Sequence, residues 1–283
     1  MKSALECIPC MVEHSLHVAM MVTECQETRK SIIKNALARI ADIDFDRSPP
    51  EMARDLHRII RELTGVDDPY LILKDRSTEM ALKLLPELRE MAADNDFETI
   101  VRLVIAGNII DYGADSHFKL STARERIIEV MDMSIDTAAI SRFERKLASA
   151  RRVLYLCDNC GETVIDRLLI EPFKEKITIA VRGGAILNDA TRREAEMSGL
   201  HELAEIIDSG DRSPGTVLKH CSEAFLNAFE NADLIISKGQ GNFETLSDTT
   251  RPICFLLRVK CPEVARNLNG VRMGSLQVIT KNF

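Results

Sequence analysis

The chain has 283 residues, of which 45% are apolar and 29% charged, and its net charge is −7. This is globular composition, with enough sequence for one large domain or two smaller ones. The acidic balance argues against nucleic acid as a partner, and the absence of an N-terminal signal region or of a long apolar run predicts a cytoplasmic protein that makes no membrane contact.

The first half of the chain reads as helical. Apolar residues recur with a helical period, and no alternating β-branched run interrupts them. Pro49 and Pro50 mark the start of one helix, and Gly65 marks its end. The periodic segments cover residues 11–23, 32–40, 52–63, 71–88, 97–109, 123–131 and 137–150. We therefore predict an all-helical domain over residues 1–148.

From residue 151 the pattern changes to short apolar runs that alternate with helix-length segments. The runs lie at residues 153–156, 177–181, 206–207, 234–236 and 253–257, with intervening segments at 163–173, 191–199 and 216–231. This spacing is typical of βαβ units, which form a mostly parallel sheet covered on both faces. We predict an α/β domain over residues 149–283, with residues 275–280 as a further edge strand.

A polar motif follows the first predicted strand. Asp158 offers a carboxylate and Asn159 an amide carbonyl, and both are oxygen donors of the type that magnesium and manganese prefer. Gly161 permits a tight turn before the next helix. The structural alternative is an ordinary strand-to-helix turn, in which one of these side chains caps the helix.

A second motif, with Asn188 and Asp189, follows the second strand. Strand ends of a parallel sheet gather at one edge, so Asp189 is a candidate third cation ligand beside Asp158. Taken alone, Asp189 would more simply cap the helix that begins near Thr191.

Glycines follow the fourth strand. Gly239, Gly241 and Asn242 form a loop in which backbone N–H groups can approach a phosphate. A lone Gly-x-Gly pair also serves ordinary turns. The chain lacks the glycine patterns of nucleoside triphosphate and dinucleotide sites at these strand ends.

Two further polar sites complete the candidate set. Lys260, after the fifth strand, can neutralise a transferring phosphoryl group, although most lysines are simply solvated. Asn108 and Asp111 lie one helical turn apart in the helical half, where they either cap a helix end or reach into a cleft between the halves.

The chain carries eight cysteines, which we expect to be thiols, metal ligands or buried apolar residues. Cys7 and Cys10 form a Cys-x-x-Cys pair, with His14 and His17 further along. This pair is a candidate structural metal site, but a closed zinc site needs four ligands, and plain structural thiols are the simpler interpretation.

In order along the chain, these motifs resemble the domain of unknown function 89 family, which includes damage-control phosphatases and acidic-residue methyltransferase-1-like proteins. The matching segments are Cys-x-x-Cys at 7–10, Ala-Gly-Asn-x-x-Asp at 106–111, Asp-Asn-x-Gly-Glu at 158–162, Arg-Gly-x-x-x-Leu-Asn-Asp-x-Thr at 182–191, Lys-Gly-x-Gly-Asn at 238–242 and Lys-Cys at 260–261. The two cysteine-bearing motifs resemble the compact prokaryotic and archaeal branch.

The resemblance implies a three-layer α/β/α sandwich of Rossmann-like type with an added N-terminal helical domain. It places the metal ligands at Asp158, Asn159 and Asp189 and the anion-binding lysine at Lys260. The remaining candidates, Gly239, Gly241, Asn242, Asn188, Asn108 and Asp111, would bind the substrate or its phosphate.

The implied activity is hydrolysis of a small phosphomonoester, a sugar phosphate or damaged phosphometabolite, with magnesium, manganese, cobalt or nickel as cofactor. The nucleophile is either water or an aspartate carboxylate, and Asp158 and Lys260 are the catalytic candidates. The alternatives are a carboxyl methyltransferase and a non-enzymatic metal- or metabolite-binding protein. The oligomeric state is left open by the sequence.

Overall fold

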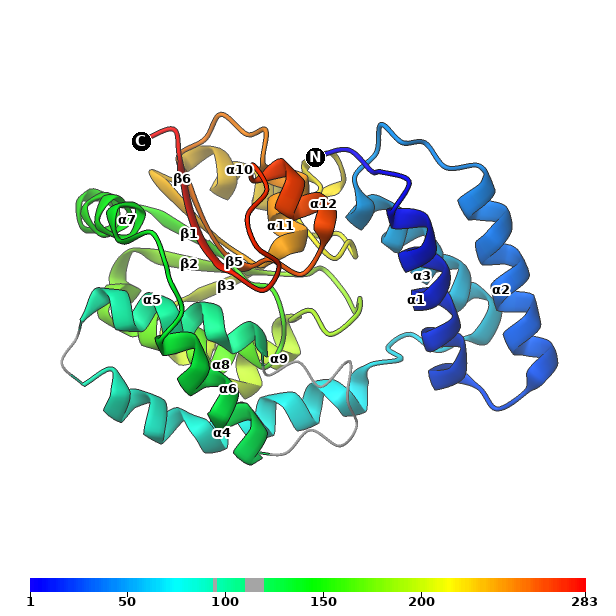
Figure 1. Cartoon of the computed structure of the whole chain (residues 1–283), viewed down its shortest axis with the longest axis horizontal. Coiled ribbons are helices and arrows are strands. Elements are labelled where there is room, and N and C mark those ends of the chain that lie inside the picture. The colour runs from blue at the N-terminus through cyan, green and yellow to red at the C-terminus, as the bar shows by residue number, and fades with distance from the viewer. Residues whose placement is uncertain (94–95, 110–119) are drawn as a thin grey trace.

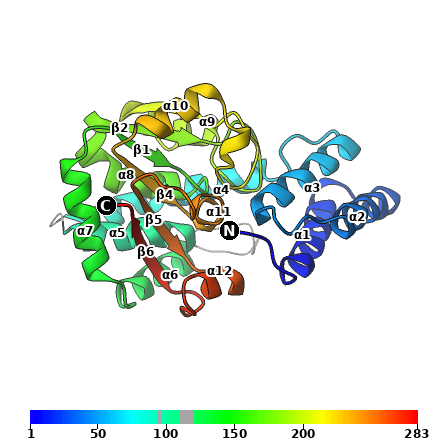
Figure 2. The same ribbon diagram turned by 90° about the horizontal axis from the view of Figure 1, so that it is seen from above.

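A computed structural model of the chain describes residues 1–93, 96–109 and 120–283 (Figure 1). Helices α1, α2 and α3 form a lobe at one side, and the remaining elements build an α/β unit around one sheet (Figures 1 and 2). The helices of the first half are α1 (Cys7–Val22), α2 (Gln26–Ala41), α3 (Pro49–Thr64), α4 (Leu71–Met91), α5 (Phe97–Ala106), η1 (Gly107–Ile109), α6 (Leu120–Met131) and α7 (Thr137–Ser149).

The sheet has six strands in the order β3-β2-β1-β4-β5-β6. The first five are parallel, and β6 pairs antiparallel with β5 at the edge. The strands are β1 (Val153–Leu156), β2 (Ile177–Val181), β3 (Glu205–Asp208), β4 (Leu234–Lys238), β5 (Ile253–Arg258) and β6 (Leu276–Lys281). The predicted α/β class and the mostly parallel sheet are confirmed.

Helices cover both faces of the sheet because strand residues alternate between them. Val153 and Tyr155 join a cluster with the helices of one face, whereas Leu154 and Leu156 pack with Phe225 and other residues on the opposite face. The helices after β1 are α8 (Glu162–Ile170), η3 (Glu171–Lys176), α9 (Arg192–Met197), η4 (Leu200–Glu202), η5 (Leu218–His220), α10 (Glu223–Asn231), α11 (Gln240–Leu246) and α12 (Pro262–Asn267). This is the predicted three-layer arrangement.

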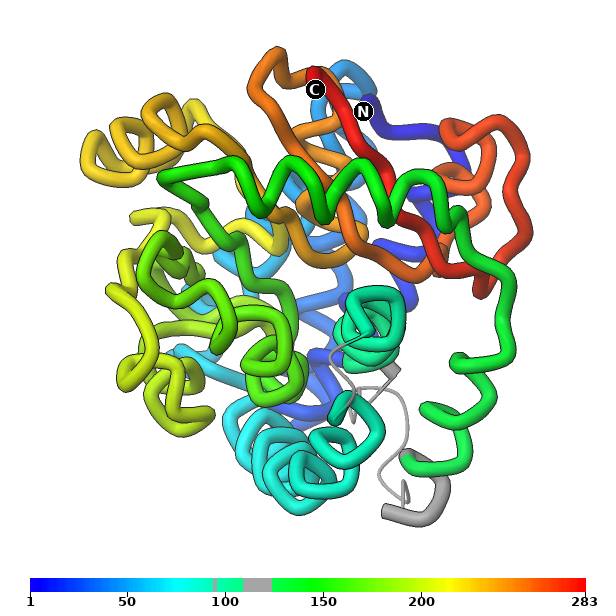
Figure 3. Tube along the Cα trace, turned by 90° about the vertical axis from the view of Figure 1, so that its left-hand side faces the viewer, coloured from blue at the N-terminus to red at the C-terminus, as the bar shows by residue number. Residues whose placement is uncertain are grey.

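The helical half of the sequence divides among three hydrophobic clusters in space. Residues of α4, α5 and α7 share the large cluster with the sheet, and α7 lies alongside β6 (Figure 3). Helices α1 to α3 instead form smaller clusters of their own. The predicted domain boundary at residues 148 and 149 marks where helical sequence gives way to strands, and as a boundary between domains it stays a prediction.

Local chemistry explains where α3 begins and ends. Ser48 and Glu51 form a capping box, with proline in the first turn, and Gly65 takes the left-handed conformation just beyond the last turn. The start at Pro49 and the end before Gly65 agree with the sequence prediction.

Ion pairs join the α1–α3 lobe to the α/β unit. Arg54 Nε of α3 donates to Asp211 Oδ1 at 2.7 Å, and Arg266 donates to Glu6 at 2.7 Å. Helix α3 also packs against α11. The lobe therefore covers the carboxyl ends of the strands, where α11 begins after β4. In the part of the chain that the structure describes, no helix combines the length and apolarity needed to cross a bilayer.

Candidate active site

The chain turns to opposite sides of the sheet after β1 and β4, so their neighbouring carboxyl ends form a switch point where ligands bind in open α/β sheets. Asp158 follows β1 here, and Gly239 follows β4. An antiparallel bridge pairs Asn159 with Asp189, and Ala190 N donates to Asp158 O at 2.8 Å. The first three predicted motifs therefore meet.

Gly239 allows Asp158 to occupy this crevice. A Cβ on Gly239 would lie 1.9 Å from Asp158 Oδ2. The backbone φ of +78° is also one that residues other than glycine rarely adopt. Its N–H donates to Leu256 O at 3.0 Å. The glycine thus makes room for the carboxylate, and its amide is committed to the sheet.

We expect Gly239→Ala to destabilise the fold and to remove activity, since both the φ strain, on the order of 1–3 kcal/mol, and the clash must be relieved by moving Asp158. Denaturant unfolding and a phosphatase assay measure the two effects. Gly270→Ala is the matched control, because Gly270 has a φ of +79° and open space around it. Equal losses of stability and activity in the two variants would contradict the steric argument.

Asp158 and Asp189 are buried and flank one arginine. Arg182 Nε donates to Asp189 Oδ2 at 2.6 Å, and an Nη atom lies 3.7 Å from Asp158 Oδ1. Burial raises the pKa of Asp158 well above its ordinary value, and the neighbouring Glu162 and Asp189 raise it further. Burial likewise raises the Asp189 pKa, against the opposing effect of Arg182. Positive charge at this point would stabilise both carboxylates.

A second buried ion-pair group is centred on Lys238. Lys238, which is fully buried, donates to Glu162 Oε2 at 2.8 Å and to Asp166 Oδ1 at 2.6 Å. Burial opposes the lysine's charge, but these two carboxylates raise its pKa above the ordinary value. Burial raises the pKa of Asp166 to about 6. Lys238 is therefore a charged part of the interior.

The buried group carries an excess of negative charge when its members are ionised. Asp158, Asp189, Glu162 and Asp166 are opposed by Arg182 and Lys238, which leaves a formal charge of −2. A divalent cation balances that charge, and carboxylate and amide oxygens are suitable donors. The residues present therefore fit such a cation. Among the described residues, no three His, Cys, Asp or Glu side chains gather as a metal site by themselves. Amide oxygens and water are the other donors that such a cation accepts.

A cavity of about 360 Å³ opens between the α1–α3 lobe and this edge of the sheet. The predicted residues that line it are Asn108, Asp158, Asn159, Asn188, Asp189, Gly241, Lys260, Cys7 and Cys10. Lys260 is exposed, and its charge lowers the Asp158 pKa against the effect of burial. Asp111 lies outside the residues that the structure describes.

Asn242 has a different position from the other candidates. Its Nδ2 donates to the carbonyls of Cys157 and Lys238, and its Oδ1 accepts from Arg182 at 3.1 Å and from Thr216 at 2.9 Å. The side chain is fully buried. Asn242 therefore orients the arginine that contacts both carboxylates.

The cysteines of the Cys-x-x-Cys pair lie in the cavity wall. Cys7 is buried, Cys10 is exposed, and Cys261 lies in the same wall. All eight cysteines of the chain are free thiols. Burial raises the pKa of the Cys7 thiol. A metal at this pair stays a prediction.

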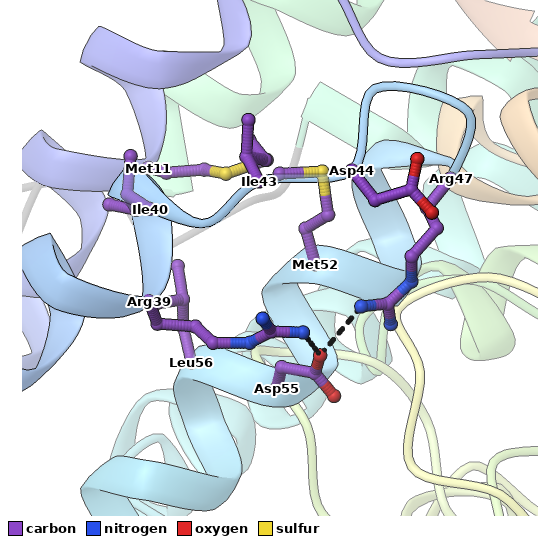
Figure 4. Close-up of a pocket in the computed structure, with 9 residues that line it drawn as sticks. All are labelled: Met11, Arg39, Ile40, Ile43, Asp44, Arg47, Met52, Asp55 and Leu56. Atoms are coloured by element: carbon purple, nitrogen blue, oxygen red, sulfur yellow. Dashed lines mark hydrogen bonds and ion pairs between the residues drawn. The ribbon is translucent and has the colours of Figure 1, made fainter.

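A smaller hollow lies within the helical lobe, away from the sheet edge. Its wall includes Asp55, which accepts hydrogen bonds from Arg39 and Arg47, both at 2.8 Å (Figure 4). The hollow has a volume of about 10 Å³, at the lower limit for a single water molecule. Because the predicted site residues line the cavity of about 360 Å³ at the sheet edge, that large cavity is the candidate substrate site.

Sequence reasoning gave no role to Arg182, Glu162, Lys238 or Asp166. Glu162, Arg182 and Lys238 lie within the motifs at 158–162, 182–191 and 238–242. Their place in these motifs was the sequence feature that could have marked them as site residues. Their function depends on which charges they meet in the interior, which the motif spacing does not show.

Comparison with known proteins supports a family assignment. The sequence model of the damage-control phosphatase ARMT1-like domain matches residues 3–276. A damage-control phosphatase of Pyrococcus horikoshii is 34% identical over 289 residues, which cover 100% of this chain and 99% of the relative. A damage-control phosphatase of Archaeoglobus fulgidus is 33% identical over 287 residues, 98% of each chain. The crystal structure of a DUF89 family protein from P. horikoshii superposes with a TM-score of 0.89 at 33% identity and covers 99% of both chains.

Proposed function

The chain belongs to the damage-control phosphatase ARMT1-like family, and from this premise we propose that it hydrolyses a small phosphomonoester with the help of a divalent cation. The substrate would be a sugar phosphate or a damaged phosphometabolite, and the cation magnesium, manganese, cobalt or nickel. In the reaction, water adds to phosphorus, the bond from phosphorus to the ester oxygen breaks, and a proton of the water passes to that oxygen, so that an alcohol and inorganic phosphate leave.

The observation that carries the proposal is the buried group of carboxylates with its charge of −2, open to a cavity that also contains Lys260. Asp158, Asn159 and Asp189 would hold the cation. When bound, the cation would draw electron density from the phosphoryl group. Arg182, bonded to Asp189 and close to Asp158, offsets the repulsion between the two carboxylates and orients them.

The phosphate would lie between the carboxylates and Lys260. The lysine supplies positive charge to the phosphoryl oxygens as charge develops on them. Asn188 and Gly241 line the same cavity and are proposed to contact the substrate. We infer supporting roles for Gly239, which makes room for Asp158, and for Asn242, which holds Arg182.

Removal of divalent cations tests the proposal. We expect a chelator to abolish hydrolysis of p-nitrophenyl phosphate by the purified chain, and added Mg²⁺, Mn²⁺, Co²⁺ or Ni²⁺ to restore it, because the carboxylates then regain their counter-charge. A panel of phosphorylated metabolites, assayed with the best cation, identifies the substrate class.

Asp189→Asn is the control for contaminating phosphatases, because its activity should not return with any cation. Activity that resists chelation would contradict the metal requirement. No hydrolysis of any phosphomonoester with any of the four cations would overturn the proposed function and leave a binding protein on this scaffold.

A further inference from the structure

Two asparagine amides converge on one buried carboxylate beside the proposed cation site. Asn159 Nδ2 donates to Glu162 Oε1 at 3.0 Å, and Asn108 Nδ2 donates to the same oxygen. Both amides also donate to Asp158 Oδ2, at 3.3 Å and 3.2 Å. Each NH₂ group is thus committed to two carboxylates, which fixes which way each amide is turned.

The orientation of the Asn108 amide leaves its oxygen unused. Asn108 is 6% exposed and lines the large cavity, and its Oδ1 is buried without a hydrogen-bond partner among the described residues. A buried acceptor without a partner is unfavourable unless a ligand satisfies it. The amide carbonyl is also a hard oxygen donor of the same kind as that of Asn159.

Lys238 fixes the carboxylate that sets these orientations. Its Nζ bonds Glu162 Oε2 at 2.8 Å and the Val104 carbonyl at 2.9 Å, and all three donor directions are used once Asp166 is included. Val104 lies one helical turn before Asn108. The lysine therefore ties the segment that carries Asn108 to the helix that carries Glu162.

We propose that Asn108 is a further oxygen ligand of the divalent cation, and that Glu162, held by Lys238, is a positioning residue that orients the amides of Asn108 and Asn159. The inference rests on the proposed function for its cation. It assigns the ligand set to both parts of the chain, with Asn108 supplied by the turn after α5 and the other ligands by the sheet edge.

Glu162→Gln tests the positioning role. The new side chain has one oxygen and one NH₂ group, while Lys238 and the two amides all present donors. If the glutamine NH₂ group faces the two asparagine amides, an amide must rotate. If it faces Lys238, the hydrogen bond to Lys238 is lost. We expect the Kd for Mn²⁺, measured by titration calorimetry, to rise about 10- to 100-fold, as for other residues that orient metal ligands.

Asp166→Asn is the matched control. Asp166 is as buried as Glu162 and bonds the same lysine, whereas the NH₂ groups of both amides are directed to Glu162 and Asp158. Loss of this charge should lower the melting temperature much as Glu162→Gln does. The Kd for Mn²⁺ should rise less than in Glu162→Gln, because both variants lose one negative charge but only Glu162→Gln also turns the amides. Equal weakening of Mn²⁺ binding in both variants would overturn the positioning role.

Asn108→Ala tests the ligand itself. In water enriched in the magnetic oxygen isotope, broadening of the Mn²⁺ paramagnetic resonance signal reports how many water molecules the bound ion carries. We expect one more water in Asn108→Ala than in the wild type, and about tenfold weaker binding. An unchanged water count would overturn Asn108 as a ligand.

Failure of this inference is distinct from failure of the proposed function. Wild-type protein that binds Mn²⁺ but hydrolyses no phosphomonoester would remove the function and leave the ligand assignment standing. Hydrolysis that depends on Mn²⁺, together with unchanged Kd and water count in the variants, would remove the inference alone. A wild-type protein that binds no divalent cation would overturn both.

Discussion

Asp158→Asn and Asp189→Asn are each expected to reduce metal-dependent phosphatase activity below detection. Each replacement takes away a cation ligand and the negative charge that balances the cation, in a buried group where water cannot substitute for that charge. The amide keeps the side-chain volume and a partner for Arg182. Steady-state hydrolysis and Mn²⁺ titration of both variants measure the effect.

Alanine is the less informative replacement at these positions. Asp189 is 3% exposed and bonds Arg182 directly, so Asp189→Ala would leave a buried arginine without its closest counter-charge. Breaking such a pair costs on the order of 3–5 kcal/mol, and loss of activity could then reflect loss of fold. The asparagine variants separate these effects.

Asp55→Asn is the matched control for both. Asp55 is as buried as Asp158 and, like Asp189, accepts from arginine, in this case from Arg39 and Arg47. It lies in the small hollow of the helical lobe, away from the proposed site (Figure 4). Asp55→Asn should keep wild-type activity when activity is expressed per folded molecule, with the folded fraction taken from denaturant unfolding. Full metal-dependent activity in Asp158→Asn and Asp189→Asn would refute the site, whatever the control shows.

Lys260→Ala is expected to lower kcat on the order of 10²–10³-fold while the Kd for Mn²⁺ stays close to the wild-type value. The lysine is exposed in the cavity wall, so its removal leaves the buried carboxylates and their pairing in place. What is lost is positive charge beside the phosphoryl oxygens. Separate measurement of kcat, KM and Mn²⁺ affinity distinguishes this from loss of the cation.

Lys34→Ala controls for the change in net charge, because Lys34 is an exposed lysine of α2 outside the cavity lining. Its kinetics should match those of the wild type. A Lys260→Ala protein with unchanged kcat would show that the phosphoryl charge is met by other groups, and the role assigned to Lys260 would be withdrawn.

Much of the fold was predictable because burial leaves a periodic trace in the sequence. The runs at 153–156 and 177–181 match β1 and β2, since strands buried on both faces must be apolar throughout. The segment at 216–231 was less readable. Its α-helix covers only Glu223–Asn231, because Ser222 caps the first turn there and the helix does not extend further toward the N-terminus.

The meeting of Asp158, Asn159 and Asp189 was also within reach of the sequence, because parallel strands present their carboxyl ends at one edge. Their immediate surroundings were not. The Lys238–Glu162 pair joins residues 76 positions apart, and Arg182 bonds Asn242 across 60 positions. The sequence shows these as polar residues near turns, with no indication that they lie in the interior.

The sequence by itself determined the strands, the shared edge and the chemical types collected there. Only the tertiary structure decided which helices cover the sheet, which glycine makes room for Asp158, and how Arg182 and Lys238 divide the buried carboxylates. The reason is physical: apolar periodicity reports how each segment is buried, whereas pairing of buried charges depends on distances between segments that meet only after the chain has folded.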